Sequence, residues 1–435
     1  MANEYVGLIG LGILVLLLLI RVPVGLSLIS VSFGGIFVLI GPRPAWGILA
    51  TVPYDFVAKW TLSSIPMFLM MGFICFHAGL TKGLFDACRS WMARLPGGLA
   101  IASVIGSAGF AAVTGSSVAC AAAMGRIAVP EMIAKRYDAA LATGTIAAAG
   151  TLGALIPPSI LLIMFGVFAE VPISKLFIGG VGAGLLTAAL YVGIIYFRAL
   201  LNPELAPRMD VRPPLSERLE HLAETWPTIL ILITVIGGLF VGLFTATEAG
   251  AVGALASIVI ATMKGTFSRE VLWNAVVETL TTTGALFLIA IGANLLTRFL
   301  ALSGSGELIA SAILGLQADP LYLILGISAL YLLLGMFLDP LGAMLLTLPV
   351  LLPVLDKSHI DLIWFGVFLV KFLEIGMITP PIGLNVFVIK GVVGNLASLT
   401  TIFRGIMWFL VADAIVVALL IIFPGIITYL PAMME

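Results

Sequence analysis

Two proline pairs occupy matched positions in the two halves of this chain, and each interrupts an apolar segment. A shift of 223 residues places five residues of the first half on identical residues of the second: Pro130 on Pro353, Asp138 on Asp361, Gly153 on Gly376, Pro157 on Pro380 and Pro158 on Pro381. Proline removes a backbone donor and clashes with the preceding turn, so a proline pair interrupts a helix. The sequence therefore predicts a duplicated unit with one broken helix in each copy.

Long apolar runs recur along the whole length and indicate that these helices lie in a bilayer. Examples are Tyr5–Ile20, Val22–Ile40, Ile229–Phe244 and Met407–Phe423. Of the 435 residues, 61% are hydrophobic and 10% are charged, which is more apolar surface than a soluble domain of this size needs. The only charged residue before the first run is Glu4. We therefore interpret that run as a membrane span rather than a signal peptide.

The polar stretch Leu201–Thr225 divides the chain into two halves with the same order of segments. Each half has two spans, an amphipathic stretch, a third span, a polar-faced piece, a stretch with a polar centre, the broken span and a closing span. This gives about ten spans in all. The amphipathic stretches are Trp46–Trp60 and Phe267–Thr283, the third spans are Leu62–Ala78 and Ala285–Leu302, and the polar-faced pieces are Lys82–Leu95 and Ser305–Ala318.

These segments predict an all-α polytopic membrane protein made of two repeats. The first repeat covers 1–200, with scaffold spans at about 1–96 and a hairpin and broken helix at about 97–170. A linker covers 201–225. The second repeat covers 226–435, with scaffold spans at about 226–318 and a hairpin and broken helix at about 320–400.

Two of the apolar stretches have polar residues at their centres. Ala100–Met124 is centred on Thr114–Ser117, and Leu321–Leu355 is centred on Asp339–Gly342. A helix that crosses the bilayer has no need for such a centre, but a re-entrant hairpin does, because its tip has free backbone groups. Small residues beside the first tip allow its two arms to pack closely. We therefore predict two re-entrant helical hairpins.

The distribution of charge predicts that the two halves are inverted relative to each other. The loop Arg126–Asp138 after the first hairpin holds three basic residues, whereas Asp356–Asp361 after the second holds one Lys and two Asp. Because basic residues are enriched in cytoplasmic loops, we expect the first loop and the basic linker in the cytoplasm and the second loop outside. Inverted repeats with paired broken helices are typical of secondary transporters, whose binding site lies at the breaks.

Each break combined with one hairpin tip predicts a cation site. Carbonyl groups freed in mid-membrane need a partner, and hard cations such as Na⁺ prefer oxygen ligands. The expected Na⁺ ligands are Thr114, Gly115, Ser116, Gly150 and Gly153 in the first site and Asp339, Gly342, Gly376 and Thr379 in the second. The alternative is that each proline pair only kinks a packed helix. Two pairs matched across a repeat favour the cation sites over that alternative.

The same region is expected to attract an anion. New half-helices begin after each tip and each proline pair, and the N-terminus of a helix favours negative charge. A carboxylate transported together with Na⁺ satisfies both tendencies. The candidate substrate ligands are Ser116, Ser117, Pro158, Thr379, Asn385 and Arg298. Arg298 lies near a span end, and the alternative is that its side chain extends to the membrane surface.

Charged residues inside apolar runs are costly and need individual explanations. Lys371 and Glu374 lie three residues apart, and we predict that they form an internal salt bridge. Glu248 stands at the start of a span and is predicted to cap it or to act as a first-turn charge. The sequence offers no explanation for Asp413 in the last span.

Several other functions are excluded or disfavoured by the sequence. The net charge is −1 without a basic block, which gives no support to a nucleic-acid partner. Cys75, Cys88 and Cys120 are scattered, so neither a metal spacing nor a disulfide framework is indicated. The serines of the first tip could suggest an intramembrane protease, but only His77, near a span end, could serve as the base. No phosphate-binding loop is present. We therefore expect a protein that is not an enzyme.

Four segments together resemble a known family over nearly the whole chain. They are Gly109–Ala119, Gly150–Ser159, Thr247–Ala251 and Thr379–Asn385. They resemble the large membrane (M) subunit of tripartite ATP-independent periplasmic (TRAP) transporters. The resemblance implies a Na⁺-driven importer of the bacterial cytoplasmic membrane with an elevator mechanism and two or more Na⁺ sites beside the substrate.

The resemblance also implies two protein partners. A soluble periplasmic substrate-binding (P) protein would deliver an organic acid, such as sialic acid, a C4-dicarboxylate or a sugar acid. A small four-helix membrane (Q) subunit, expected to be a separate chain, would help to hold the scaffold. Two other hypotheses stay open: a stand-alone Na⁺/dicarboxylate symporter of similar fold, and a channel or scaffold without ion coupling.

Overall fold

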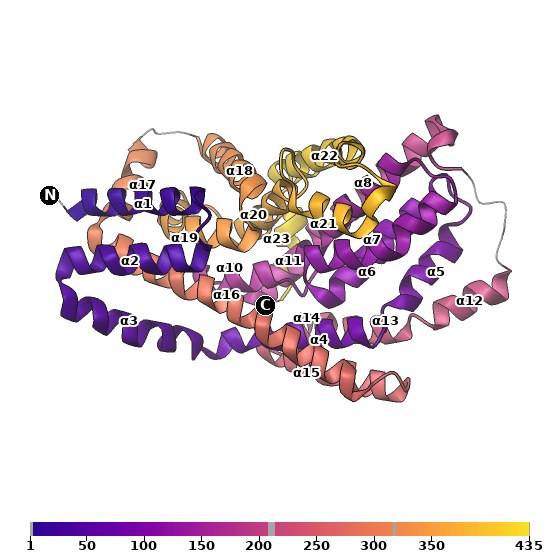
Figure 1. Ribbon diagram of the computed structural model, residues 1–435, viewed down its shortest axis with the longest axis horizontal. Coiled ribbons are helices and arrows are strands. Elements are labelled where there is room, and N and C mark those ends of the chain that lie inside the picture. The colour runs from indigo at the N-terminus through magenta and orange to yellow at the C-terminus, as the bar shows by residue number, and fades with distance from the viewer. Residues whose placement is uncertain (1–2, 208–213, 316–318, 435) are drawn as a thin grey trace.

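The chain folds into an elongated bundle of helices, as Figure 1 shows. The computed structural model describes residues 3–207, 214–315 and 319–434, and these contain no β-strand. The helices of the first half are α1 (Asn3–Leu19), α2 (Val24–Ile40), α3 (Pro42–Val57), η1 (Trp60–Ser63), α4 (Ser64–His77), α5 (Lys82–Met92), α6 (Gly98–Thr114), α7 (Ser117–Ala134), α8 (Ala139–Gly150), α9 (Leu152–Leu155), α10 (Ile160–Ala169) and α11 (Ile173–Leu201).

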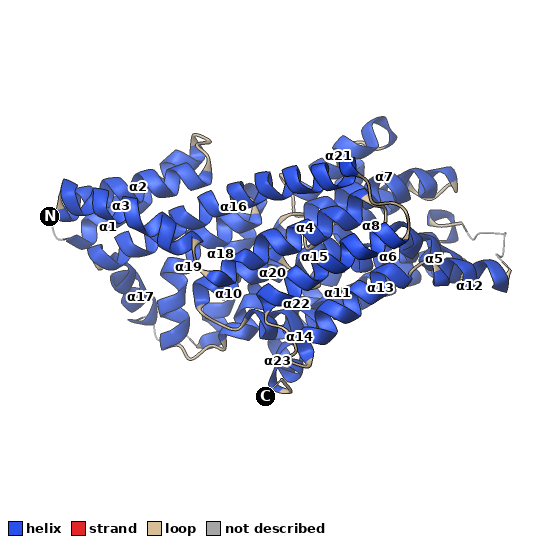
Figure 2. Cartoon of the chain, turned by 90° about the horizontal axis from the view of Figure 1, so that it is seen from below, coloured by secondary structure: helices blue, strands red, loops and turns tan. Residues whose placement is uncertain are grey.

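The remaining helices follow the predicted linker or lie within it. They are η2 (Pro203–Leu205), α12 (Leu215–Ala223), α13 (Trp226–Leu232), η3 (Ile233–Gly237), α14 (Gly238–Phe240), α15 (Ala246–Met263), α16 (Arg269–Ser303), α17 (Ser305–Gly315), α18 (Pro320–Phe337), α19 (Pro340–Lys357), α20 (Leu362–Gly376), α21 (Leu384–Val393), η4 (Gly394–Leu396), α22 (Leu399–Ile422) and α23 (Gly425–Ala432). Figure 2 shows the same helices from below.

The helices confirm the predicted all-α polytopic membrane class. Within the described ranges, nine helical segments are long and apolar enough to cross a membrane. The number is ten if α12 and the α13–α14 segment, which meet at a 44° bend, form one span. The boundaries predicted for the two repeats, and the inversion of one relative to the other, stay predictions.

Both predicted hairpins double back on themselves. In the first hairpin, the Cys120 thiol on α7 donates to the Ser107 carbonyl oxygen on α6 at 3.4 Å. In the second, the Tyr331 hydroxyl on α18 hydrogen-bonds to the Thr347 hydroxyl on α19. Residues on opposite sides of each tip are therefore neighbours, which is the geometry of antiparallel arms.

One predicted boundary in the second half is absent. The amphipathic stretch expected over 267–283 and the span expected over 285–302 form the single 35-residue helix α16. Its counterpart in the first half is divided, because Lys59 between α3 and η1 has extended backbone angles (φ −61°, ψ 124°). No proline interrupts α16, and its two isolated glycines, Gly284 and Gly292, are tolerated within a helix. The end of the predicted 305–318 piece and linker residues 208–213 lie outside the described residues.

Two groups of buried apolar residues hold the helices together. The larger group joins α1, α2, α4, α10, α15, α16 and the second hairpin with α20. The smaller group joins the first hairpin with α8, α21 and α22. The helix after the second break, α21, therefore packs with the first hairpin and with the helix before the first break. This arrangement brings parts of the two halves together at the breaks.

Candidate functional site

The tip of the first hairpin lies directly against the first break. Gly115 at the tip has a left-handed backbone (φ +62°), and a Cβ built on it would stand 2.3 Å from the Pro158 carbonyl oxygen. A Cβ on Gly153 would stand 2.7 Å from the Ser116 carbonyl oxygen. Backbone therefore meets backbone at two points, and only glycine permits so close an approach.

Two helix N-termini meet at this contact. Ser116 caps α7 by accepting a hydrogen bond from the Ala119 N–H at 3.4 Å. Ser159 caps α10 in the same way, accepting from the Leu162 N–H at 3.3 Å. The Gly115 Cβ position is 3.7 Å from the Ser159 Cα, so the two caps are neighbours. Two positive helix ends at one point favour an anion.

Two buried oxygen atoms without a hydrogen-bond partner belong to the same region of the described structure. They are Ser117 Oγ, one residue beyond the Ser116 cap, and Asn385 Oδ1, whose side-chain amide lies beside Gly150. Buried polar groups are nearly always hydrogen-bonded, so such a set needs an explanation. Pro157 and Pro158 also supply no N–H to the helical carbonyls four residues before them. Oxygen atoms of this kind suit a hard cation.

The second hairpin meets the second break one turn before its tip. A Cβ on Gly376 would stand 2.7 Å from the Gly335 Cα, so α20 and α18 touch through backbone. At the tip, Asp339 is exposed and its Oδ2 accepts a 2.8 Å hydrogen bond from the Gly342 N–H, which caps α19. The Thr379 hydroxyl donates to the Ile375 carbonyl oxygen at 2.7 Å. Asp339 is thus first of all a helix cap.

Asn385 connects the two halves. It follows the second break and is fully buried, and its Nδ2 lies 3.4 Å from the Ala147 carbonyl oxygen on α8. A Cβ on Gly150 would stand 3.3 Å from that same Nδ2. The structure therefore brings the predicted site residues Gly150 and Asn385 together, although they belong to different breaks.

A cavity of about 910 Å³ opens beside the first tip. Thr114 and Ser116 line it, together with charged residues of both signs: Lys82, Asp86, Arg126, Glu131 and Glu278. Arg89 on α5 donates to Glu131 at 2.8 Å, and this hydrogen bond raises the pKa of the Arg89 guanidinium. Arg298 does not line the cavity. It lies 16 residues beyond Thr282 on α16, about 24 Å along the helix.

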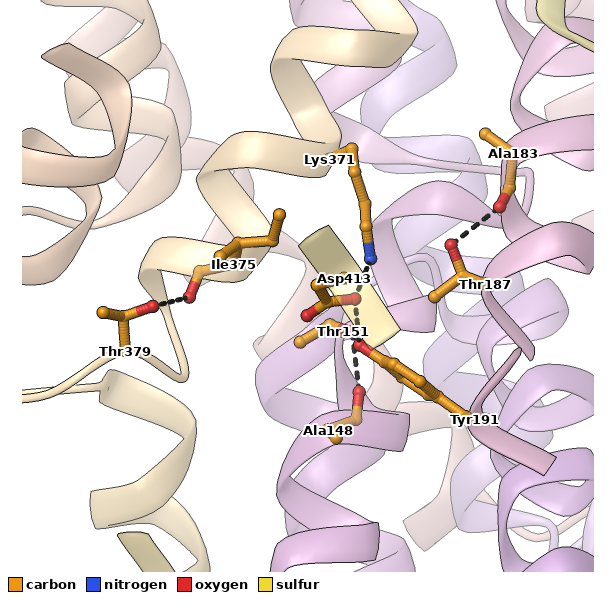
Figure 3. A network of polar contacts seen from close by, with 9 residues as sticks. All are labelled: Ala148, Thr151, Ala183, Thr187, Tyr191, Lys371, Ile375, Thr379 and Asp413. Carbon is orange, nitrogen blue, oxygen red and sulfur yellow. Dashed lines mark hydrogen bonds and ion pairs between the residues drawn. The ribbon is translucent and has the colours of Figure 1, made fainter. Parts of the chain in front are cut away.

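The predicted Lys371–Glu374 salt bridge is wrong. Lys371 Nζ on α20 instead pairs with Asp413 Oδ1 on α22 at 2.5 Å, and both side chains are buried. The Tyr191 hydroxyl donates to the same oxygen at 2.7 Å, as Figure 3 shows. The true partner is 42 residues away in the sequence, and spacing within one helix could not reveal it. The network also explains the buried Asp413.

Two other charged groups have structural partners. Glu248 forms a capping box, accepting at Oε2 from the Thr245 N–H at 2.8 Å, which confirms the predicted cap. His77 Nε2 lies 3.2 Å from Glu278 Oε1 across the cavity wall. His77 is thus paired with a carboxylate rather than placed as a base for the tip serines.

The fold and the site together define a transport permease: a polytopic helical protein with two hairpins, two broken helices and a polar region between them. The family description "Tripartite ATP-independent periplasmic transporter, DctM component" matches residues 11–426. The chain belongs to this family of TRAP transporter large permeases. The members are transport proteins and not enzymes.

Individual relatives have different named substrates. The chain is 34% identical to the C4-dicarboxylate TRAP transporter large permease protein DctM of Pseudomonas aeruginosa, covering 88% of this chain and 87% of that protein. It is 30% identical to the sialic acid TRAP transporter large permease protein SiaM of Vibrio cholerae, covering 95% and 96%. The structure of the Alcanivorax borkumensis YdaH transporter shares the fold, with a TM-score of 0.61, 18% identity and coverage of 88% and 89%.

Proposed function

We propose that this chain is the membrane subunit of a Na⁺-coupled importer of an organic acid, and that it works by an elevator movement in the cytoplasmic membrane. A periplasmic binding protein delivers the acid, and a small membrane subunit assembles with the scaffold. Relatives are named for C4-dicarboxylates, sialic acid, 2,3-diketo-L-gulonate and isethionate. All of these are organic anions, and all except the sulfonate isethionate have a carboxylate, so a carboxylate is the substrate class proposed here.

The observation that carries the proposal is the contact of the first tip with the first break. Two helix N-termini and the unpaired buried oxygens of Ser117 and Asn385 lie within this one region. The N-termini favour the substrate carboxylate, and the oxygens favour Na⁺ as co-substrate. Ser116 and Ser117 are the proposed carboxylate donors. Asn385 and the Gly150–Gly153 backbone belong to the same region, whereas Arg298 is left outside the proposed site.

Uptake into proteoliposomes tests the proposal. We expect radiolabelled acid to accumulate only when this chain, its small membrane partner, a loaded binding protein and an inward Na⁺ gradient are all present. Uptake by this chain alone would instead support the stand-alone Na⁺/dicarboxylate symporter. A Na⁺-independent conductance would contradict coupled transport.

Ser116→Ala and Thr379→Ala test the two breaks separately. Each removes a hydroxyl near a tip or break, and each is expected to reduce Na⁺-driven uptake about tenfold, as the loss of one ligand worth about 1.4 kcal/mol would. Thr281→Ala is the matched control, because the exposed Thr281 hydroxyl donates to the Val277 carbonyl oxygen at 2.8 Å, as Thr379 does to Ile375. Unchanged Na⁺ dependence in both site variants would refute their role as ligands.

A further inference from the structure

A buried chain of polar side chains runs between the two broken helices. Lys371 pairs with Asp413 at 2.5 Å, and Asp413 accepts the Tyr191 hydroxyl at 2.7 Å. The Tyr191 oxygen lies 3.4 Å from the Thr151 hydroxyl, which lies 2.6 Å from the Ala148 carbonyl oxygen. The four side chains are each at most 1% exposed. Figure 3 shows them in sequence between α20 and α8.

The two ends of this network of polar side chains lie next to the two breaks. Lys371 stands on α20, five residues before Gly376. Thr151 stands between α8 and α9, two residues before Gly153. Lys371 and Asp413 come from the second half, and Tyr191 and Thr151 come from the first. The polar network therefore connects the two halves through side chains alone.

Each hydroxyl in this polar network can donate only one hydrogen bond, which limits the arrangements of the network. The single hydroxyl proton of Tyr191 is directed to the Asp413 carboxylate, so its oxygen is left as an acceptor for Thr151. The single hydroxyl proton of Thr151 then has two acceptors, the Ala148 carbonyl at 2.6 Å and the Tyr191 oxygen at 3.4 Å. The shorter distance shows that Thr151 donates to Ala148 in this structure. A small approach of Tyr191 would redirect the Thr151 hydrogen bond to the Tyr191 oxygen and release the Ala148 carbonyl.

We propose that Tyr191 is a positioning residue that transmits the state of the second break to the cation site at the first break. Movement of α20 displaces Lys371, and with it the Asp413–Tyr191 pair. The position of Tyr191 then determines whether the Thr151 hydroxyl donates to the Ala148 carbonyl or to Tyr191. This choice sets the conformation of the backbone that leads into Gly153. The two acceptors of Thr151 supply the two-state element that coupling between sites needs. The inference rests on the proposed Na⁺ coupling.

Tyr191→Phe isolates this role, because it removes only the hydroxyl. The ring keeps its edge contact with Phe409, at 5.2 Å between centroids, and its position 5.5 Å from Lys371 Nζ. The readout is thermal unfolding of the purified protein titrated with NaCl, with KCl keeping the ionic strength constant. We expect the Na⁺ concentration for half-maximal stabilisation to rise about fivefold, the lower end of typical coupling between sites. Without the Tyr191 hydroxyl, Thr151 stays directed to the Ala148 carbonyl. Thr151→Val leaves that carbonyl permanently free, so it is expected to shift the Na⁺ half-point in the opposite direction.

Tyr196→Phe is the matched control on α11, because within the described residues its hydroxyl makes no hydrogen bond, and its titration should equal that of the wild type. A lower melting temperature in both Tyr191→Phe and Thr151→Val, with an unchanged Na⁺ half-point, would show a purely structural role and overturn the inference. If Na⁺ does not stabilise the wild type more than K⁺, the proposed Na⁺ coupling itself fails, and the inference fails with it.

Discussion

Lys371 and Asp413 form an ion pair between side chains that are at most 1% exposed. The stability of the protein should therefore depend strongly on keeping both partners. Replacing only Lys371 with Met leaves the Asp413 carboxylate buried without its partner. We expect this to cost about 3–5 kcal/mol of unfolding free energy. The measurement is unfolding of the detergent-solubilised protein, followed by circular dichroism in a denaturant titration.

The paired replacement Lys371→Met with Asp413→Leu is the control for this prediction. Apolar side chains of similar volume often replace a buried ion pair without loss, so the double variant should recover most of the stability lost in the single variant. A single variant as stable as the wild type would show that the pair does not hold α20 to α22.

Sequence reasoning predicts single residues well where their partners are local. The Glu248 cap is a contact over three residues, and the sequence indicates it directly. The partners of Lys371 and Tyr191 lie on other helices, 42 and 222 residues away. No pattern within one helix identifies such a contact. Two charges at helical spacing instead suggested the wrong pair, because Lys371 reaches Asp413 on another helix.

Among the elements, the hairpins and breaks could be predicted because their causes are local. Thr114–Ser117 is polar in an apolar stretch, and adjacent prolines cannot continue a helix. The continuity of α16 was missed, because an amphipathic face suggested a separate element where the backbone has no reason to stop. Which tip faces which break depends on packing between distant segments. The close glycine contacts show that the first tip meets the first break, whereas the sequence repeat could only suggest this pairing.

The contact between the first tip and the first break leads to a prediction about glycines. Gly115→Ala would place a methyl group against the Pro158 carbonyl oxygen and would strain a left-handed backbone. We expect a loss of uptake of more than tenfold, equivalent to at least about 1.4 kcal/mol, because backbone on both sides prevents relaxation. Uptake in proteoliposomes, corrected for the amount of inserted protein, measures the effect.

Gly391→Ala on α21 is the control for this change. A Cβ at Gly391 meets nothing within 4 Å, so uptake should stay at the wild-type level. Normal uptake by Gly115→Ala would mean that the tip and the break separate during transport without needing this close approach.

At the scale of the whole molecule, the two halves share an order of elements more than a set of residues. Each half has a hairpin followed by a helix that ends at a cis proline pair, Pro157–Pro158 in one and Pro380–Pro381 in the other. The polar contacts differ: serine hydroxyls cap the helices at the first tip, and the Asp339 carboxylate caps the helix at the second. The duplicated framework was therefore visible in the sequence, whereas the different chemistry of the two sites was only partly visible.

The orientation of the two hairpins is the remaining prediction at this scale. If the halves are inverted, Lys135 after α7 faces the cytoplasm and Asp356 at the end of α19 faces the periplasm, as the loop charges indicate. Both side chains are exposed, so a cysteine at either position is open to reagents. In a variant with Cys75, Cys88 and Cys120 replaced, a membrane-impermeant maleimide should label Asp356→Cys in spheroplasts and Lys135→Cys only in inside-out vesicles. Labelling of both from one side would mean that the hairpins enter from the same face, and the elevator arrangement of two opposed hairpins would not hold.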